Sequence, residues 1–187
     1  LAAAEGYRRH LDQGGKMLLA MAGAMSTAEL GISLAEMIRA DKVHAISCTA
    51  ANLEEDVFNL VAGPDYEIVP SWRDLSAVEE RRLYERGMNR VTDTCIPEKV
   101  MRHIEGRLLD SWKRASAAEE RKMPSEFLFE ILCDPELESH FQIEPENSWV
   151  LAAKKAGIPV YAPGWEDSTT GNIFTANVMM GNLPDHS

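Results

Sequence analysis

The fold is decided by residues 43–61, which read VHAISCTAANLEEDVFNLV. Its first part, residues 43–49, is a short and largely apolar run, which predicts a strand. Asn52 is a candidate N-cap for a helix over residues 53–61, because an asparagine side chain accepts hydrogen bonds from a first helical turn. The three acids at positions 54–56 then lie in that turn, where the helix dipole favours carboxylates.

A second strand and helix precede this stretch. Residues 16–22, KMLLAMA, form a brief apolar run after two glycines, which is typical of a buried strand. Ser26 and Glu29 match a capping box, in which each side chain satisfies a free backbone N–H group of the other residue. The helix that they open would present one apolar face, formed by Leu30, Leu34, Met37 and Ile38. Two successive strand–helix pairs indicate a parallel sheet.

The middle of the chain is charged and helical in pattern. Apolar residues at helical spacing predict helices over residues 75–87, 98–113 and 125–133. These helices form an insertion over about residues 72–135. Asn147 and Ser148 then cap a helix over residues 149–156, Gly157 ends it, and a third strand follows over residues 158–162.

Together these elements predict an α/β fold, a Rossmann-like parallel sheet flanked by helices with a helical insertion in the middle. A chain of 187 residues suits one core, so residues 1–187 are expected to form a single Rossmann-like domain. The sequence opens on Leu1 rather than Met and shows no closing element before Ser187. We therefore expect it to be an incomplete part of a longer chain.

The charge balance restricts the partners. Nineteen Lys and Arg residues face 30 Asp and Glu residues, which gives a net charge of -11. Such a chain repels phosphate backbones and has no basic patch, so nucleic-acid binding is not expected. The three cysteines form no paired motif, which argues against a metal site and favours a reducing compartment. The longest apolar run, residues 17–25, is too short for a bilayer, so we expect a cytoplasmic protein without a membrane span.

Candidate ligand-binding residues follow each predicted strand. Ligands of open parallel sheets bind beyond the carboxyl ends of the strands, where residues 23–29, 49–56 and 163–172 would lie. All three segments combine small, hydroxyl and acidic residues. Ordinary loops and helix caps are the alternative interpretation. The sequence has no glycine-rich dinucleotide fingerprint, although a phosphate could rest on the N–H groups at the start of the helix after Ser26.

Two of these segments contain acidic residues that could bind a cation. Neighbours in a helix point about 100° apart, so we expect one or two of the acids at 54–56 to bind a cation and the rest to face water or interact with the helix dipole. The alternative is a solvated first turn in which all three acids favour the dipole. Residues 165–172, WEDSTTGN, offer an indole face for a cation, two acids, three hydroxyl groups and an amide. The alternative is an Asx-type turn around a packed tryptophan, within a loop over residues 163–171.

Four stretches, residues 22–31, 49–56, 88–93 and 148–172, resemble deoxyhypusine synthase. The resemblance runs from about residue 14 to residue 181 and is greatest to the bacterial deoxyhypusine-synthase-like branch. It implies a Rossmann-like fold, NAD as cofactor, and an acidic spermidine pocket at a subunit interface of a homotetramer. In that family, NAD accepts a hydride from spermidine, and a 4-aminobutyl group passes through an enzyme lysine to an acceptor.

The resemblance also implies roles for individual residues. It assigns cofactor binding to Ser26, Thr27, Glu29, Thr49, Ala50, Ala51, Glu55 and Asp167. It assigns polyamine binding to Glu54, Glu55 and Asn172. Two positions depart from the family pattern, since Asn172 stands where the family has Asp and Asn52 stands where it has Gly. The family's catalytic lysine is expected beyond Ser187, so the catalytic residues of this sequence are unknown.

These observations predict an NAD-dependent transferase that moves a 4-aminobutyl group from spermidine to an amine acceptor. The acceptor is a protein lysine or a free amine such as putrescine, and the sequence leaves both open. The alternative is a non-catalytic domain that binds a polyamine or a nucleotide.

Overall fold

The computed structural model describes residues 1–184, so the last three residues of the predicted domain lie outside the described part. Three parallel strands form its main sheet, β1 (Leu18–Met21), β2 (Ala45–Cys48) and β6 (Val160–Tyr161). Their order is β1-β2-β6, with Leu18 beside Ala45 and Ile46 beside Val160. All three predicted strands are confirmed, and so is the α/β fold.

The first strand is not buried as its sequence predicted. β1 is an edge strand whose residues alternate between exposed and half-buried positions, and Leu18 is 61% exposed. The central strand β2 instead carries the buried residues Ile46 and Cys48. An apolar run alone does not distinguish an edge strand from a central one, which explains the error.

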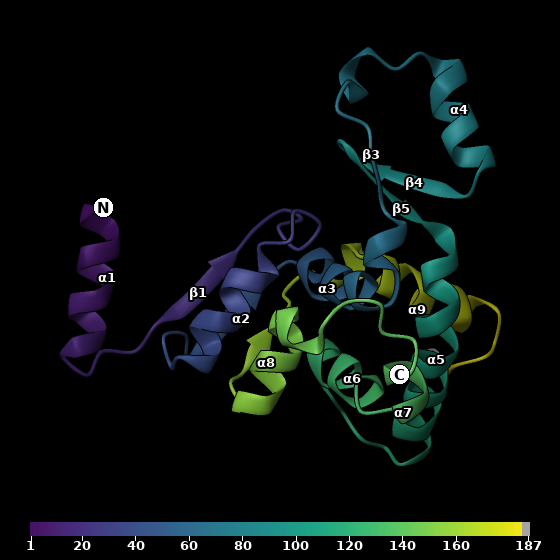
Figure 1. Ribbon diagram of the computed structural model, residues 1–187. Coiled ribbons are helices and arrows are strands. Elements are labelled where there is room, and N and C mark those ends of the chain that lie inside the picture. Colours follow the sequence, from purple (N-terminus) through teal and green to yellow (C-terminus); the bar gives the residue numbers. More distant parts are fainter. Residues whose placement is uncertain (185–187) are drawn as a thin grey trace.

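Helices cover this sheet and extend beyond it. They are α1 (Ala2–Asp12), α2 (Gly31–Arg39), α3 (Ala50–Ala62), α4 (Ala77–Glu85), α5 (Met101–Ala117), α6 (Pro124–Ile131), α7 (Pro135–Glu138), α8 (Trp149–Ala156) and α9 (Thr169–Met179). Short 3-10 turns lie at Gly63–Asp65, Trp72–Asp74, Glu98–Val100, Pro145–Asn147 and Trp165–Asp167. α2 packs on α8, while α3 contacts both α8 and α9. Helix α1 stands apart from the body and buries none of its residues (Figure 1). Among residues 1–184, no helix is both long and apolar enough to cross a membrane.

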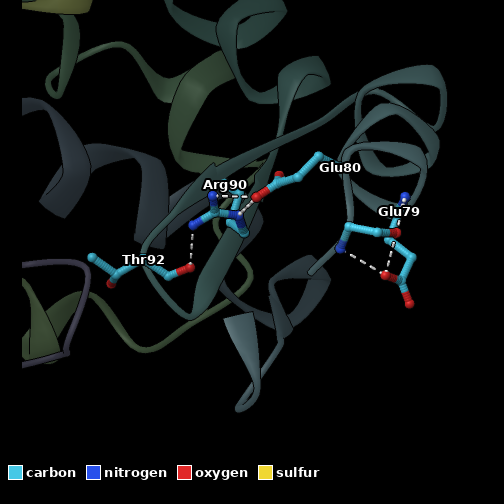
Figure 2. Close-up of polar contacts among 5 residues, drawn as sticks. Glu79, Glu80, Arg90 and Thr92 are labelled. Atoms are coloured by element: carbon cyan, nitrogen blue, oxygen red, sulfur yellow. Dashed lines mark hydrogen bonds and ion pairs between the residues drawn. The ribbon is translucent and has the colours of Figure 1, made fainter. Parts of the chain in front are cut away.

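The middle of the chain contains a second sheet that the sequence analysis did not predict. β3 (Glu67–Ile68), β5 (Thr94–Pro97) and β4 (Met88–Val91) pair antiparallel in that order. With α4 they form a lobe that projects from the body (Figure 1). Arg90 of β4 donates to the Glu80 carboxylate of α4 and to the Thr92 carbonyl, as Figure 2 shows. These strands are too short to leave a clear period of two in the sequence.

Two predicted helix starts and the end of one predicted loop are wrong. Ser26 and Glu29 form no capping box, because residues 25–30 form turns and α2 begins only at Gly31. Its buried face is therefore Gly31, Leu34, Ala35 and Ile38, while Leu30 is exposed. Thr49 caps α3 instead of Asn52, which lies inside the first turn. The predicted loop over 163–171 ends early, since Ser168 caps α9.

Candidate functional site

The structure brings the three candidate segments together at the carboxyl edge of the parallel sheet. The Thr49 hydroxyl donates to the Gly23 carbonyl at 2.6 Å, which joins the segments that follow β2 and β1. The Thr169 N–H group donates to Glu54 Oε1 at 3.0 Å, which joins the segment that follows β6 to α3. The N-terminal half of α3 is therefore the element that the other two segments surround.

None of the three adjacent acids of α3 faces water, contrary to the expectation. Glu54, Glu55 and Asp56 are only 3%, 6% and 4% exposed. Because neighbours on a helix diverge by about 100°, each carboxylate reaches a different part of the structure.

Glu54 caps helix α9 from a distance of 115 residues along the chain. Its carboxylate accepts the N–H groups of Thr169 and Thr170 at 3.0 and 2.9 Å, and the Thr170 hydroxyl at 2.9 Å. These N–H groups belong to the first turn of α9, where backbone N–H groups have no acceptor within their own helix. A negative charge at a helix N-terminus also interacts favourably with the helix dipole.

Asp56 makes the corresponding contacts at the start of α8. Its carboxylate accepts the Ser148 hydroxyl at 2.5 Å and the Val150 N–H group at 3.1 Å, with a longer contact from Trp149 N at 3.4 Å. Burial raises the pKa of Asp56 to about 6, against the lowering effect of these hydrogen bonds. The acid is therefore a structural group of the α3–α8 junction.

Glu55 points to the segment after β1, where its hydrogen-bond partner is Thr27. Its carboxylate accepts the Thr27 hydroxyl. Burial raises the pKa of Glu55, the Thr27 hydrogen bond lowers it, and the neighbouring Glu54 charge raises it. The Thr27 backbone N–H group adds a second hydrogen bond to this carboxylate. Within residues 1–184 no cation pairs with Glu55, so the buried carboxylate retains capacity to accept further hydrogen bonds.

Ser26 is held from three sides and is fully buried. Its hydroxyl donates to the Asn52 carbonyl at 2.6 Å and accepts the Trp149 indole N–H at 3.0 Å. The Asn59 side chain donates to the Ser26 carbonyl at 2.8 Å. The contacts of Asn59 and Trp149 with Ser26 were not predicted, because no local sequence pattern relates these residues.

The remaining candidates divide into buried and exposed positions. Ala50 is buried and Ala51 half-buried at the first turn of α3. Glu29, Asp167 and Asn172 are exposed at the rim, and Asn172 lies in the first turn of α9. Figure 1 shows α3 and α9 next to each other at the centre of the body, in agreement with their contacts.

The indole of Trp165 packs against other aromatic rings and is half-buried. It lies edge-on to Trp112 and Phe174 at ring-centroid distances of 6.2 and 5.6 Å, and its N–H donates to the Thr170 hydroxyl at 3.0 Å. Together with Phe127, these rings line an open groove of about 960 Å³ between α5, α6 and α9. The alternative of a turn around a packed tryptophan therefore describes this residue better.

The carboxyl edge of the sheet fits a dinucleotide in part. A Cβ atom added at Gly23 would meet no heavy atom within 4 Å, so a ligand can approach the backbone there. The small Ala50 and Ala51 leave the first turn of α3 free of bulky side chains. The Glu55 carboxylate is a suitable acceptor for ribose hydroxyl groups.

Comparisons with known proteins point to one family. The family model for deoxyhypusine synthase matches residues 1–183. The chain is 25% identical over 155 residues to the Archaeoglobus fulgidus protein named "Probable deoxyhypusine synthase 2", covering 83% of this chain and 47% of that one. It is also 25% identical over 167 residues to the "Deoxyhypusine synthase regulatory subunit" of Trypanosoma brucei brucei, covering 86% and 46%.

A solved structure supports the fold. A crystal structure described as a "putative deoxyhypusine synthase" from Entamoeba histolytica superimposes with a TM-score of 0.57 at 14% identity, covering 90% of this chain and 49% of that one. The chain thus spans about half the length of the curated relatives it matches. Since the family model covers nearly all of its residues, the chain belongs to the deoxyhypusine synthase family.

Proposed function

We propose that the protein is an NAD-dependent transferase that moves a 4-aminobutyl group from spermidine to an amine acceptor. The observation that carries this proposal is the meeting of the three loop segments around α3, with Glu55 buried among them, in a chain of the deoxyhypusine synthase family. Within the family, we place the chain nearest the bacterial branch. We further propose a cytoplasmic homotetramer whose subunit interface completes the spermidine pocket.

The proposed roles follow the positions of the side chains. Ser26, Thr27, Glu29, Thr49, Ala50, Ala51, Glu55 and Asp167 would hold NAD, which when bound accepts the hydride from the amine substrate. Glu55 has a second role, because a spermidine ammonium group would supply the cation that this buried carboxylate lacks. Asn172 would meet an amine at the exposed start of α9, as a neutral acceptor. Glu54 would act indirectly, by fixing α9 in place.

The test is NAD-dependent release of 1,3-diaminopropane from spermidine by the complete native protein. We expect the product to form only with NAD present, and Glu55→Ala to abolish it. A matched control is Glu36→Ala, which removes an exposed glutamate of α2 outside the site. Supplying putrescine or a lysine-containing protein as acceptor identifies the second substrate, and Asn172→Asp should shift the preference between them. Absence of product from a protein that binds both ligands would refute the transferase.

One observation favours a second candidate, a non-catalytic polyamine- or nucleotide-binding domain. Of the three residues that the resemblance assigns to the polyamine, Glu54 is already occupied by three hydrogen-bond donors and Asn172 carries no charge, which leaves Glu55 to neutralise an ammonium group. Calorimetric titration of the complete protein with spermidine and with NAD distinguishes the two candidates. Binding heat without any amine product supports the binding domain, whereas turnover excludes it.

A further inference from the structure

Two successive backbone N–H groups after strand β1 converge on a single oxygen atom. Met25 N lies 2.7 Å and Ser26 N 3.2 Å from Oδ1 of Asn52. Successive N–H groups that point to one place form a concavity of the type that binds anions, since both donors address the same oxygen. In this structure the concavity holds an oxygen from the chain itself.

The Asn52 carboxamide is fixed in the orientation that aims its oxygen at these donors. Its nitrogen donates to the Gly23 carbonyl at 2.8 Å and contacts the Thr49 hydroxyl oxygen at 2.7 Å. If the carboxamide were flipped, its oxygen would face the Gly23 carbonyl, which cannot donate a hydrogen bond. The Asn52 side chain is completely buried, which holds the carboxamide in this orientation.

We propose that Asn52 is a specificity-determining residue that fills the anion concavity of the first loop and so limits how tightly this loop takes a dinucleotide phosphate. The proposal rests on the proposed NAD site and deepens it. A phosphate oxygen needs the donors that the Asn52 oxygen already uses. The loop that carries these donors lies at the surface, since Met25 is 42% exposed and a Cβ atom added at Gly23 would meet no heavy atom within 4 Å.

Two substitutions at this position have opposite expected effects on binding. Asn52→Gly removes the carboxamide, frees the Met25 and Ser26 donors and leaves room for a phosphate oxygen, so the dissociation constant for NAD should fall by about fivefold or more. Asn52→Asp keeps an oxygen on both donors and adds a negative charge against the phosphates, so the constant should rise about tenfold. A purely structural residue would shift both variants in the same direction, since both remove contacts of the native carboxamide.

A matched control comes from α9. Asn177 is also buried, and its side-chain nitrogen donates to the Ile173 carbonyl at 2.9 Å, away from the first loop. Asn177→Asp introduces the same charge and should lower the melting temperature without changing the NAD dissociation constant.

The experiment is calorimetric titration of the complete protein and its variants with NAD, combined with hydrogen exchange of the Met25 and Ser26 amides. In the unaltered protein NAD should leave these two exchange rates unchanged. In Asn52→Gly they should rise without NAD and fall again when NAD is added. Equal or weaker NAD binding by Asn52→Gly, with binding retained by the unaltered protein, overturns the inference alone. If neither protein binds NAD, the proposed NAD site is wrong and the inference falls with it.

Discussion

Replacement of Glu54 by glutamine tests whether this acid is structural. The carboxylate accepts three donors of the first turn of α9 at 2.9 to 3.0 Å, from Thr169 and Thr170. Glutamine has one acceptor oxygen, so its NH₂ group must face at least one of the two backbone N–H groups. Hydrogen bonds to charged groups contribute about 1.5–3 kcal/mol each, so the loss of one or two of them lowers the free energy of unfolding by about 2–4 kcal/mol.

The assay is thermal unfolding followed by circular dichroism, with hydrogen exchange over α9 as a local readout. For a chain of this size, the expected loss corresponds to a melting temperature lower by about 5–15 °C. Exchange should accelerate in the first turn of α9 before it does so elsewhere. Glu36→Gln, on the exposed side of α2, changes the same chemical group without a contact to lose. If both variants melt within about 1 °C of each other, the capping role assigned to Glu54 is refuted.

Three further predictions concern other contacts of the fold. Burial raises the folded pKa of Asp56 to about 6 from 3.8, so the folded state favours the protonated acid. Stability relative to Asp56→Asn should therefore fall by about 2–3 kcal/mol as pH rises from 4 to 7, and a constant difference in denaturant titrations would contradict this. Gly31→Ala places a Cβ atom 2.8 Å from Asp56 Oδ1 and should cost about 1–3 kcal/mol in urea unfolding, whereas Gly6→Ala, with nothing within 4 Å, should cost nothing. Arg90→Lys loses the forked contact with Glu80 and should destabilise by about 1 kcal/mol, which a double-mutant cycle with Glu80→Gln measures; additivity of the two would argue against the pair.

Elements that depend on local chemistry were predictable from the sequence. Helix α8 matches its predicted range, because Ser148 caps one end and Gly157 adopts the left-handed conformation, φ 65°, at the other. The central strand β2 was equally clear, since its residues form a short apolar run. The alternation of strands and helices then fixed the parallel sheet, and the sheet fixed the edge where the candidate segments meet.

The errors concern residues whose partners lie far along the chain. Ser26 and Glu29 have the spacing of a capping box, yet Ser26 is captured by Asn52 and Trp149, 26 and 123 residues away. The burial of Glu54 could not be predicted either, because its hydrogen-bond donors lie more than 100 residues away in the sequence. A run of charged residues at a helix start normally predicts exposure to solvent, and these acids are buried by tertiary contacts that the local sequence does not reveal.

The three acids of α3 differ in what a ligand would have to displace. Glu54 and Asp56 satisfy backbone N–H groups at the starts of α9 and α8, so drawing either carboxylate toward a polyamine would leave helix donors unpaired. The partner of Glu55 is Thr27, whose hydroxyl can rotate to another acceptor and whose backbone N–H group lies in the turns before α2 rather than in a helix. Of the two acids that the resemblance assigns to the polyamine, Glu55 is therefore the one that can exchange its partner for a cation. Substitutions at Glu54 then report on stability, and those at Glu55 report on binding.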